Sequence, residues 1–172
     1  FTIGNNSKIE GDINTATNQV NIFLQSPDVI LYGVEFKELS ISGKSEAKQF
    51  LAKLKAGEFM LNDSLKVDNF SFNASSTRDS ASFQLSTRNA DSSKIYIDLG
   101  ATTYFRNKEI ALTLLPQSVL VIDKHQWHFS PSNTIVFGND IVFRDFKIFK
   151  DDKESLEISG KVSNNSTDIL NL

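Results

Sequence analysis

The strand character of this chain is clearest in residues 95–101, which read IYIDLGA. Ile95, Ile97 and Leu99 stand at every second position. Because successive side chains of a β-strand point to opposite faces, this period of two predicts a strand with one apolar face. The same alternation continues toward the C-terminus at residues 110–114, 127–129, 135–137, 146–148 and 156–158.

Short polar breaks separate these runs, and earlier runs of the same kind stand at residues 20–24, 30–36 and 70–74. The breaks contain turn-forming residues, as in Arg106-Asn107-Lys108 and Gly138-Asn139-Asp140. A spacing of about 8–12 residues from strand to strand is typical of antiparallel structure. No helical crossover separates the runs, so a parallel sheet is disfavoured. The sequence therefore predicts an all-β chain of antiparallel strands.

One segment, residues 45–56, fits two structures. Ala47, Phe50, Leu51 and Leu54 have the spacing of the apolar stripe of a short helix. In a strand, Phe50 and Leu54 would share one face and Leu51 would point to the other. The surrounding strands favour the second structure, because tertiary context overrides propensities of this size. We expect a strand here and keep a short helix as the alternative.

Composition narrows the possible classes of protein. Hydrophobic residues make up 40% and charged residues 23% of the chain, which argues against disorder. The net charge of −3, without a long basic run, argues against nucleic-acid binding. The absence of cysteine excludes a disulfide framework and a thiolate metal site. The aliphatic run at residues 119–122 is far too short to span a bilayer.

Weak internal repeats predict how the strands are organised. The motifs Ile9-Glu10-Gly11, Ile41-Ser42-Gly43 and Ile158-Ser159-Gly160 resemble one another, and residues 67–72 resemble residues 142–148. A repeated strand–turn unit has no core of its own and must stack on its neighbours. We therefore expect residues 1–172 to form a single segment of a repetitive domain. The chain starts at a Phe and stops within strand-like sequence, so we also expect a fragment of a larger protein.

No constellation of residues points to catalysis. His125 and His128 are three residues apart, so in a strand they would point to opposite faces, and a shared metal would need a bend there. Asp151, Asp152 and Glu154 lack the spacing of a calcium loop and are expected to form a solvated turn. There is no Gly-x-Ser-x-Gly elbow and no phosphate-binding loop. The sequence predicts a non-enzyme without cofactor or metal.

The order of the C-terminal elements resembles the TamB family, large envelope proteins of diderm bacteria that are related to the AsmA-like group. A Trp-containing strand at residues 127–129 is followed by apolar strands at 135–148 and by an Ile-x-Gly strand at 156–162. The resemblance covers residues 94–172 and extends only loosely to the first half. The Asn- and Ser-rich turns resemble the members from Bacteroides-type bacteria.

This resemblance implies a long sheet curled into an open, taco-shaped groove with an apolar inner face. It implies a periplasmic location and a parent chain anchored in the inner membrane. It also implies a role in moving phospholipid toward the outer membrane and in envelope assembly, with an outer-membrane assembly protein of the Omp85 type as partner.

The alternation alone leaves two interpretations of the apolar rows. In an open groove they would hold phospholipid acyl chains, whereas in a closed barrel or sandwich they would only form a core. With the resemblance, we expect a groove. Its predicted wall is Ile95, Ile97, Leu99, Ile110, Leu112, Leu114, Trp127, Phe129, Ile135, Phe137, Phe146, Ile148, Leu156 and Ile158. The alternatives are a scaffold that binds a partner strand by β-augmentation and an adhesin-like or carbohydrate-binding β-sandwich.

Overall fold

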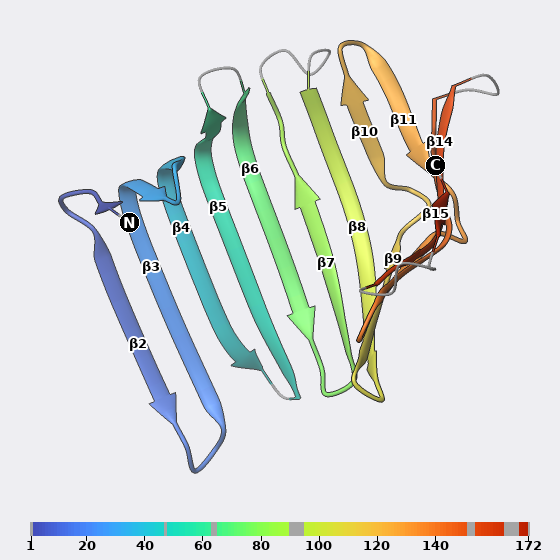
Figure 1. Cartoon of the computed structure of the whole chain (residues 1–172). Helices are drawn as coiled ribbons and strands as arrows, with labels where there is room; N and C mark the ends of the chain where they lie inside the picture. The colour runs from blue at the N-terminus through green and yellow to red at the C-terminus, as the bar shows by residue number, and fades with distance from the viewer. Residues whose placement is uncertain are drawn as a thin grey trace.

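The computed structural model describes residues 2–46, 48–62, 65–89, 95–150, 154–163 and 169–171 (Figure 1). None of these residues is helical, and their strands join in a single antiparallel sheet of 15 strands. The all-β antiparallel class predicted from the alternation is therefore confirmed. Within the described residues, no helix is long and apolar enough to cross a membrane.

The strands are β1 (Thr2–Ile3), β2 (Lys8–Asn14), β3 (Gln19–Leu31), β4 (Val34–Glu46), β5 (Gln49–Asn62), β6 (Leu65–Ser76), β7 (Ser80–Ser86), β8 (Ile95–Arg106), β9 (Glu109–Leu114), β10 (Val119–Ile122), β11 (His125–Phe129), β12 (Thr134–Phe137), β13 (Ile141–Phe149), β14 (Ser155–Val162) and β15 (Leu170–Asn171). From β2 to β8 each strand pairs with the next along the chain. Figure 1 shows these strands side by side, while the later strands turn out of their plane.

Residues 45–46 belong to β4 and residues 49–56 to β5, so the alternative of a short helix is wrong for the described residues. Leu54 pairs with Ile41 on one side and with Phe72 on the other. A helix would give up the hydrogen bonds of both ladders, and helix propensity, worth less than about 1 kcal/mol per residue, does not compensate for that loss. Ala47, part of the proposed helical stripe, lies outside the described residues.

Tight turns join several neighbouring strands. Asn107 and Lys108, between β8 and β9, have φ angles of 51° and 66°. Asp123 and Lys124, between β10 and β11, have φ angles of 48° and 70°. Two consecutive residues with positive φ are the pattern of a type I′ turn, whose twist matches that of the strands it joins. The predicted turn at residues 106–108 is therefore a hairpin.

The sheet divides at β8 and closes again at β13. The first half of β8 pairs with β10, which pairs with β11, and its second half pairs with β9, which pairs with β12. β11 and β12 then pair with different halves of β13. Two narrow ribbons therefore connect β8 to β13.

Buried polar side chains fill the seam where the sheet divides. Ser118 Oγ accepts a hydrogen bond from Gly100 N at 3.0 Å and lies 3.1 Å from Gly100 O. Asn133 Oδ1 accepts a hydrogen bond from Leu114 N at 3.0 Å. Both side chains are 1% exposed. They satisfy backbone groups that have no strand partner at the seam, as buried backbone requires.

A row of distorted positions crosses the first half of the sheet, and we call it the crease. It consists of Pro27, Glu38, Gly57 and Asn69, which lie at the same level on β3, β4, β5 and β6. Glu38 and Asn69 have φ angles of 52° and 49°. Such a distortion re-aims the side chains around it. Two apolar residues that are three apart on one strand, with the crease between them, therefore share a face of the sheet. The apolar cluster around Val29, Leu39 and Ala56 shows this arrangement.

β13 has a comparable distortion. Asp145 has a φ of 48°, and the register with β14 shifts between Phe143 and Phe146. The rings of these two phenylalanines are 6.1 Å apart, so both point to the same face. The resemblance between residues 67–72 and 142–148 thus has a structural cause, because each segment places a positive-φ residue just before a phenylalanine.

Candidate functional site

One face of the sheet carries no Lys, Arg, Asp or Glu on the described strands, and we call it the apolar face. Residues paired across strands point to the same side, so register defines each face. One row of this face consists of Ile9, Leu24, Ile41, Leu54, Phe72, Leu85 and Leu99, each paired with the next. The adjacent row consists of Gly11, Ile22, Gly43, Ala52, Ala74, Phe83, Ala101 and Leu114. The charged side chains of these strands all lie on the other side, the charged face.

The structure places all fourteen residues of the predicted wall on the apolar face. Ile97 pairs with Leu120, which pairs with Trp127. Leu112 pairs with Ile135. The remaining members follow by alternation or pairing along the same strands, and they are Ile95, Leu99, Ile110, Leu114, Phe129, Phe137, Phe146, Ile148, Leu156 and Ile158.

These fourteen residues differ in how much surface they offer. Phe129 is only 5% exposed, so it contributes to packing. Ile110, Phe137 and Leu156 are 40%, 38% and 46% exposed, and most of the others are half-buried. The apolar face is therefore accessible over many strands, rather than filled like an ordinary core.

Sequence reasoning missed the part of the apolar face that lies in the first half of the chain. The ring of Phe59 lies 5.3 Å from the rings of both Phe36 and Phe70, and the ring of Phe72 lies 5.9 Å from that of Phe83. The sequence does carry a signal for this part of the face. Two apolar residues stand three apart with two polar residues between them, and this spacing interrupts the period of two at the crease.

Three buried polar side chains of the apolar face point their polar atoms to the backbone. Ser26 Oγ donates to Asp28 O at 2.7 Å, and Thr87 Oγ1 accepts from Ile97 N at 3.1 Å. Thr103 Oγ1 donates to a backbone oxygen of β7 at 3.3 Å. All three residues are at most 3% exposed. The face therefore offers a ligand few free hydrogen-bonding groups.

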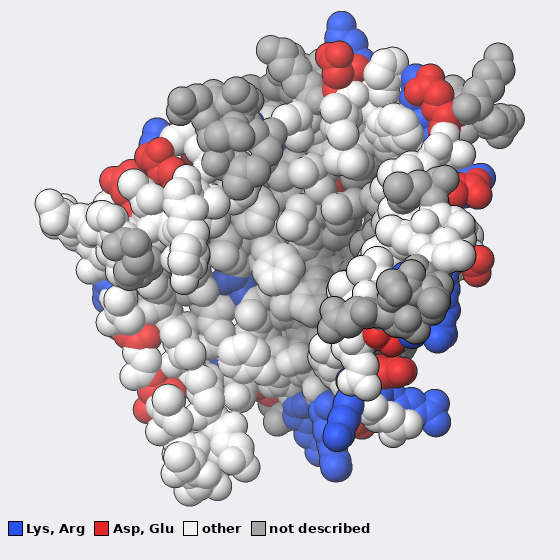
Figure 2. Space-filling view, in the orientation of Figure 1, with Lys and Arg blue, Asp and Glu red and all other residues white. Residues whose placement is uncertain are grey.

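Figure 2 shows that this side of the molecule is hollowed. Its floor is almost free of charged groups, and most of the blue and red groups lie around the outline. Register and surface therefore agree on an uncharged, concave area bordered by polar turns.

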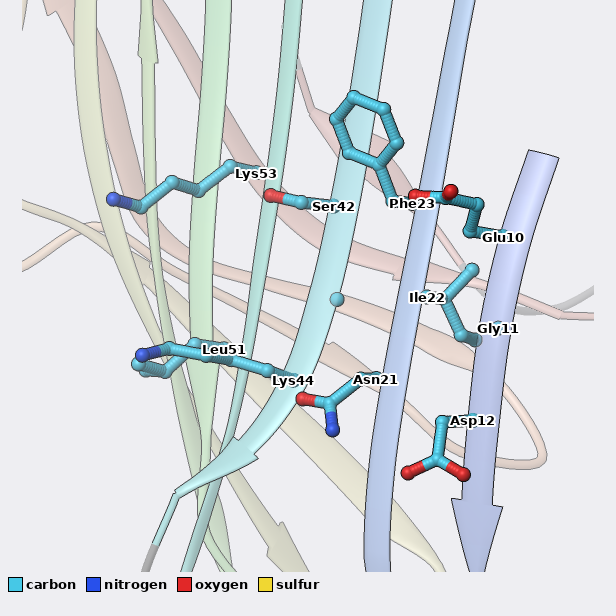
Figure 3. A pocket seen from close by; sticks show the side chains of 11 residues that line it. Glu10, Gly11, Asp12, Asn21, Ile22, Phe23, Ser42, Lys44, Leu51 and Lys53 are labelled. Atoms are coloured by element: carbon cyan, nitrogen blue, oxygen red, sulfur yellow. The ribbon is translucent and has the colours of Figure 1, made fainter. Parts of the chain in front are cut away.

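The charged face has a groove of its own, of about 460 Å³, over β2–β5 (Figure 3). Two paired rows of side chains line it: Glu10, Phe23, Ser42 and Lys53, and Asp12, Asn21, Lys44 and Leu51. Figure 3 shows the two carboxylates on β2 and the two lysines on β4 and β5, at opposite sides of the groove. Charges of both signs stand at its sides, while Phe23, Leu51 and other apolar groups form much of its lining.

Ion pairs tie the strands of the charged face together near the crease. Glu58 on β5 lies 3.1 Å from Lys37 Nζ on β4 and 3.0 Å from Lys66 Nζ on β6. Hydrogen bonds from Lys66 and Lys37 lower the pKa of Glu58. The hydrogen bond to Glu58 raises the pKa of each lysine. These groups stabilise neighbouring strands and are arranged as a structural network.

The two histidines considered for metal binding lie on opposite faces of the sheet. The ring of His128 lies tilted against that of Phe149 of β13, with ring centroids 5.9 Å apart, while His125 pairs with Ile122 at the end of β11. Their offset of three residues places them on opposite faces, as predicted. In the described part of the chain, no group of three potential metal ligands is found. Asp151 and Asp152 lie outside the described residues, and Glu154 pairs with Lys150.

Comparison of this chain with protein-family models, with curated proteins and with solved structures found no match in any of the three. The resemblance to the TamB family therefore stays a prediction.

Proposed function

We propose that this chain is a segment of a periplasmic lipid conduit that holds phospholipid acyl chains on its apolar face. The observation that carries the proposal is a hollowed face without a charged side chain on its described strands, whose large residues stay accessible. Apolar surface left in water costs about 25 cal/mol per Å², so an extended accessible area indicates a partner that covers it.

Acyl chains suit this face because they need no directed hydrogen bonds. The apolar rows continue from β2 to β14 without a Lys, Arg, Asp or Glu side chain, and the buried hydroxyls of Ser26, Thr87 and Thr103 are already hydrogen-bonded to the backbone. An acyl chain lying on such a surface meets similar surroundings at each step. It can therefore move along the surface without having to leave a deep free-energy minimum. Polar head groups would point to the turns at the border. This passive mechanism matches what the resemblance to the TamB family implies.

The proposal is tested by placing a charge on the apolar face. We expect Leu112→Arg, and the more exposed Ile110→Arg, to reduce the phospholipid that co-purifies from a diderm host, measured by mass spectrometry. The reason is that a bound acyl chain would bury the unpaired guanidinium away from water, which costs free energy. Gln126→Arg on β11 is the matched control, because this exposed residue points to the charged face.

Circular dichroism must show that each variant keeps its strands. Wild-type protein without bound lipid, or folded Ile110→Arg with as much lipid as Gln126→Arg, would contradict the proposal.

A second candidate function is strand binding at the edge of the sheet. Among the described strands β2 pairs with β3 alone, so its other side offers backbone groups that no described strand pairs with, over seven exposed residues. Such an edge is a template for β-augmentation, for example by an assembly partner of the Omp85 type. We expect Glu10→Pro, which removes a backbone donor, to abolish co-purification of that partner but leave lipid content unchanged. The third alternative, a sandwich, needs two stacked sheets and gains no support from a single one.

A further inference from the structure

An exposed apolar row marks the end of the sheet where β8 turns into β9. It consists of Phe105, Ile110, Phe137, Ile141 and Val162, each paired with the next across five strands. These residues are 37–43% exposed, whereas Thr103, the next position inward on β8, is 3% exposed. We call this row the apolar lip.

Three cations stand beside the apolar lip. Arg106 ends β8, and Lys108 belongs to the turn that follows. Arg78 lies in the turn before β7, which is held beside the lip by a hydrogen bond from Phe105 N to Asp79 O at 3.0 Å. Among the ion pairs of the described residues, none involves these three side chains.

The local charge balance is positive but mixed. Asp79 and Glu109 lie in the same area, so three positive and two negative charges leave a net charge of +1. Figure 2 shows blue groups gathered at this lower end, below β8 and β9. Tyr104, 60% exposed on the charged face, adds an aromatic ring with a polar tip next to the lip.

We propose that this end of the sheet docks on the surface of a bilayer that contains anionic phospholipid. Aliphatic and aromatic side chains beside arginine and lysine are the combination that binds at the membrane interface. The apolar lip would enter the boundary between head groups and acyl chains. Arg78, Arg106 and Lys108 would bind the phosphates, to which a guanidinium donates paired hydrogen bonds. This inference goes beyond the conduit proposal and does not depend on cargo in the hollow.

Co-sedimentation with vesicles tests the docking. We expect the protein to bind vesicles of phosphatidylcholine mixed with phosphatidylglycerol more tightly than vesicles of phosphatidylcholine alone. Each cation near an anionic surface contributes about fivefold in partitioning. The two neighbouring acids are the same in both proteins, so the variant Arg78→Gln/Arg106→Gln/Lys108→Gln, which removes three cations, should lose on the order of a hundredfold.

The matched control is Lys53→Gln/Lys55→Gln/Lys124→Gln, which changes the net charge equally. Lys53 and Lys55 lie on the charged face of β5, and Lys124 lies in a turn at the opposite end of the sheet. This variant should bind like the wild type. Raising the salt from about 0.1 M to about 1 M, which shortens the screening length from about 10 Å to about 3 Å, should weaken binding of the wild type.

The absence of cysteine allows the orientation to be read with a single fluorescent label. A polarity-sensitive dye on Thr77→Cys, in the turn beside the lip, should shift to the blue on anionic vesicles, whereas the same dye on His125→Cys should not. Equal binding of the two triple variants, no preference for anionic vesicles, or a larger shift at position 125 would overturn the docking proposal. None of these results touches the conduit proposal, whose readout is lipid carried by the purified protein.

Discussion

Glu58 shows how single residues hold this one-layer sheet together. Its carboxylate lies between Lys37 and Lys66, so it connects β4 and β6 across β5. The three side chains are partly exposed to solvent, and such pairs contribute modestly to stability. They matter here because few residues are fully buried, so the ladders and cross-strand pairs carry a large share of the stability.

The shifted pKa of Glu58 predicts a specific dependence of stability on pH. Hydrogen bonds from Lys66, and next from Lys37, lower this pKa in the folded state. The contribution is therefore present above the unfolded value of about 4.3 and is lost as the pH falls through the lower, folded pKa. We expect Glu58→Gln to flatten the acid limb of stability against pH, measured by urea unfolding.

Glu109→Gln provides the control for that measurement, because no ion pair of the described residues involves Glu109. Equal acid limbs for the two variants would show that Glu58 has no such role. At the alkaline end the sign is reversed. The pKa values of Lys37 and Lys66 are raised, so their contribution is lost as the pH rises through those raised values.

At the scale of the strand, the crease re-aims whole rows of side chains. Without it, strict alternation would turn either Phe36 or Leu39 toward the charged face, since the two are three residues apart. Positive φ at Glu38 and Asn69 removes this conflict. Neighbouring strands carry the distortion at the same level, so the ladder stays paired on both sides of it.

Substitution at Asn69 tests the need for this backbone conformation. A β-branched residue is strained at a φ of 49°, whereas glycine is not. We expect Asn69→Ile to be about 1–3 kcal/mol less stable than Asn69→Gly in urea unfolding. Both variants lose the hydrogen bond from Asn69 to Arg88 O, so their difference isolates the backbone.

Asn73→Ile, on the same strand but without positive φ, is the control for the change in side chain. A loss of stability as large at position 73, or no difference between the two variants at position 69, would show that the crease is not set by backbone strain.

The crease also explains how far sequence reasoning could go at this scale. Period-two alternation correctly assigned the strands of the second half and their shared face. It failed where polar residues with positive φ shift the period, because αL conformations at Glu38 or Asp145 have no local sequence signal as strong as glycine. The resemblance between residues 67–72 and 142–148 was visible, but its cause required the backbone.

At the scale of the whole molecule, the division of the sheet was beyond sequence reasoning. Which strands pair with each half of β8 depends on contacts far apart in the chain, and alternation carries no information on partners. The sequence does carry one sign of where the sheet divides. Pro116 and Pro131 each stand two residues before a buried polar side chain, Ser118 and Asn133, in the links between the two ribbons.

The accessible apolar face leads to a prediction about the stability of the whole fold. If acyl chains cover this face only in the folded state, a single-chain phospholipid must stabilise it by mass action. At a monomer concentration of about 100 times Kd, we expect the free energy of unfolding to rise by about 2.7 kcal/mol. Trp127, the single tryptophan, lies on this face and should report the binding by a blue-shifted emission.

An analogue with the same head group and a two-carbon chain separates this effect from binding of the head group. It should leave both the unfolding midpoint and the Trp127 emission unchanged, because it brings almost no apolar area to the face. If both lipids shift the unfolding midpoint equally, the head group binds to the polar turns around the apolar face, and the acyl chain contributes nothing. If neither does, the rows of the apolar face cover one another in solution and act as a core, and the conduit proposal fails with them.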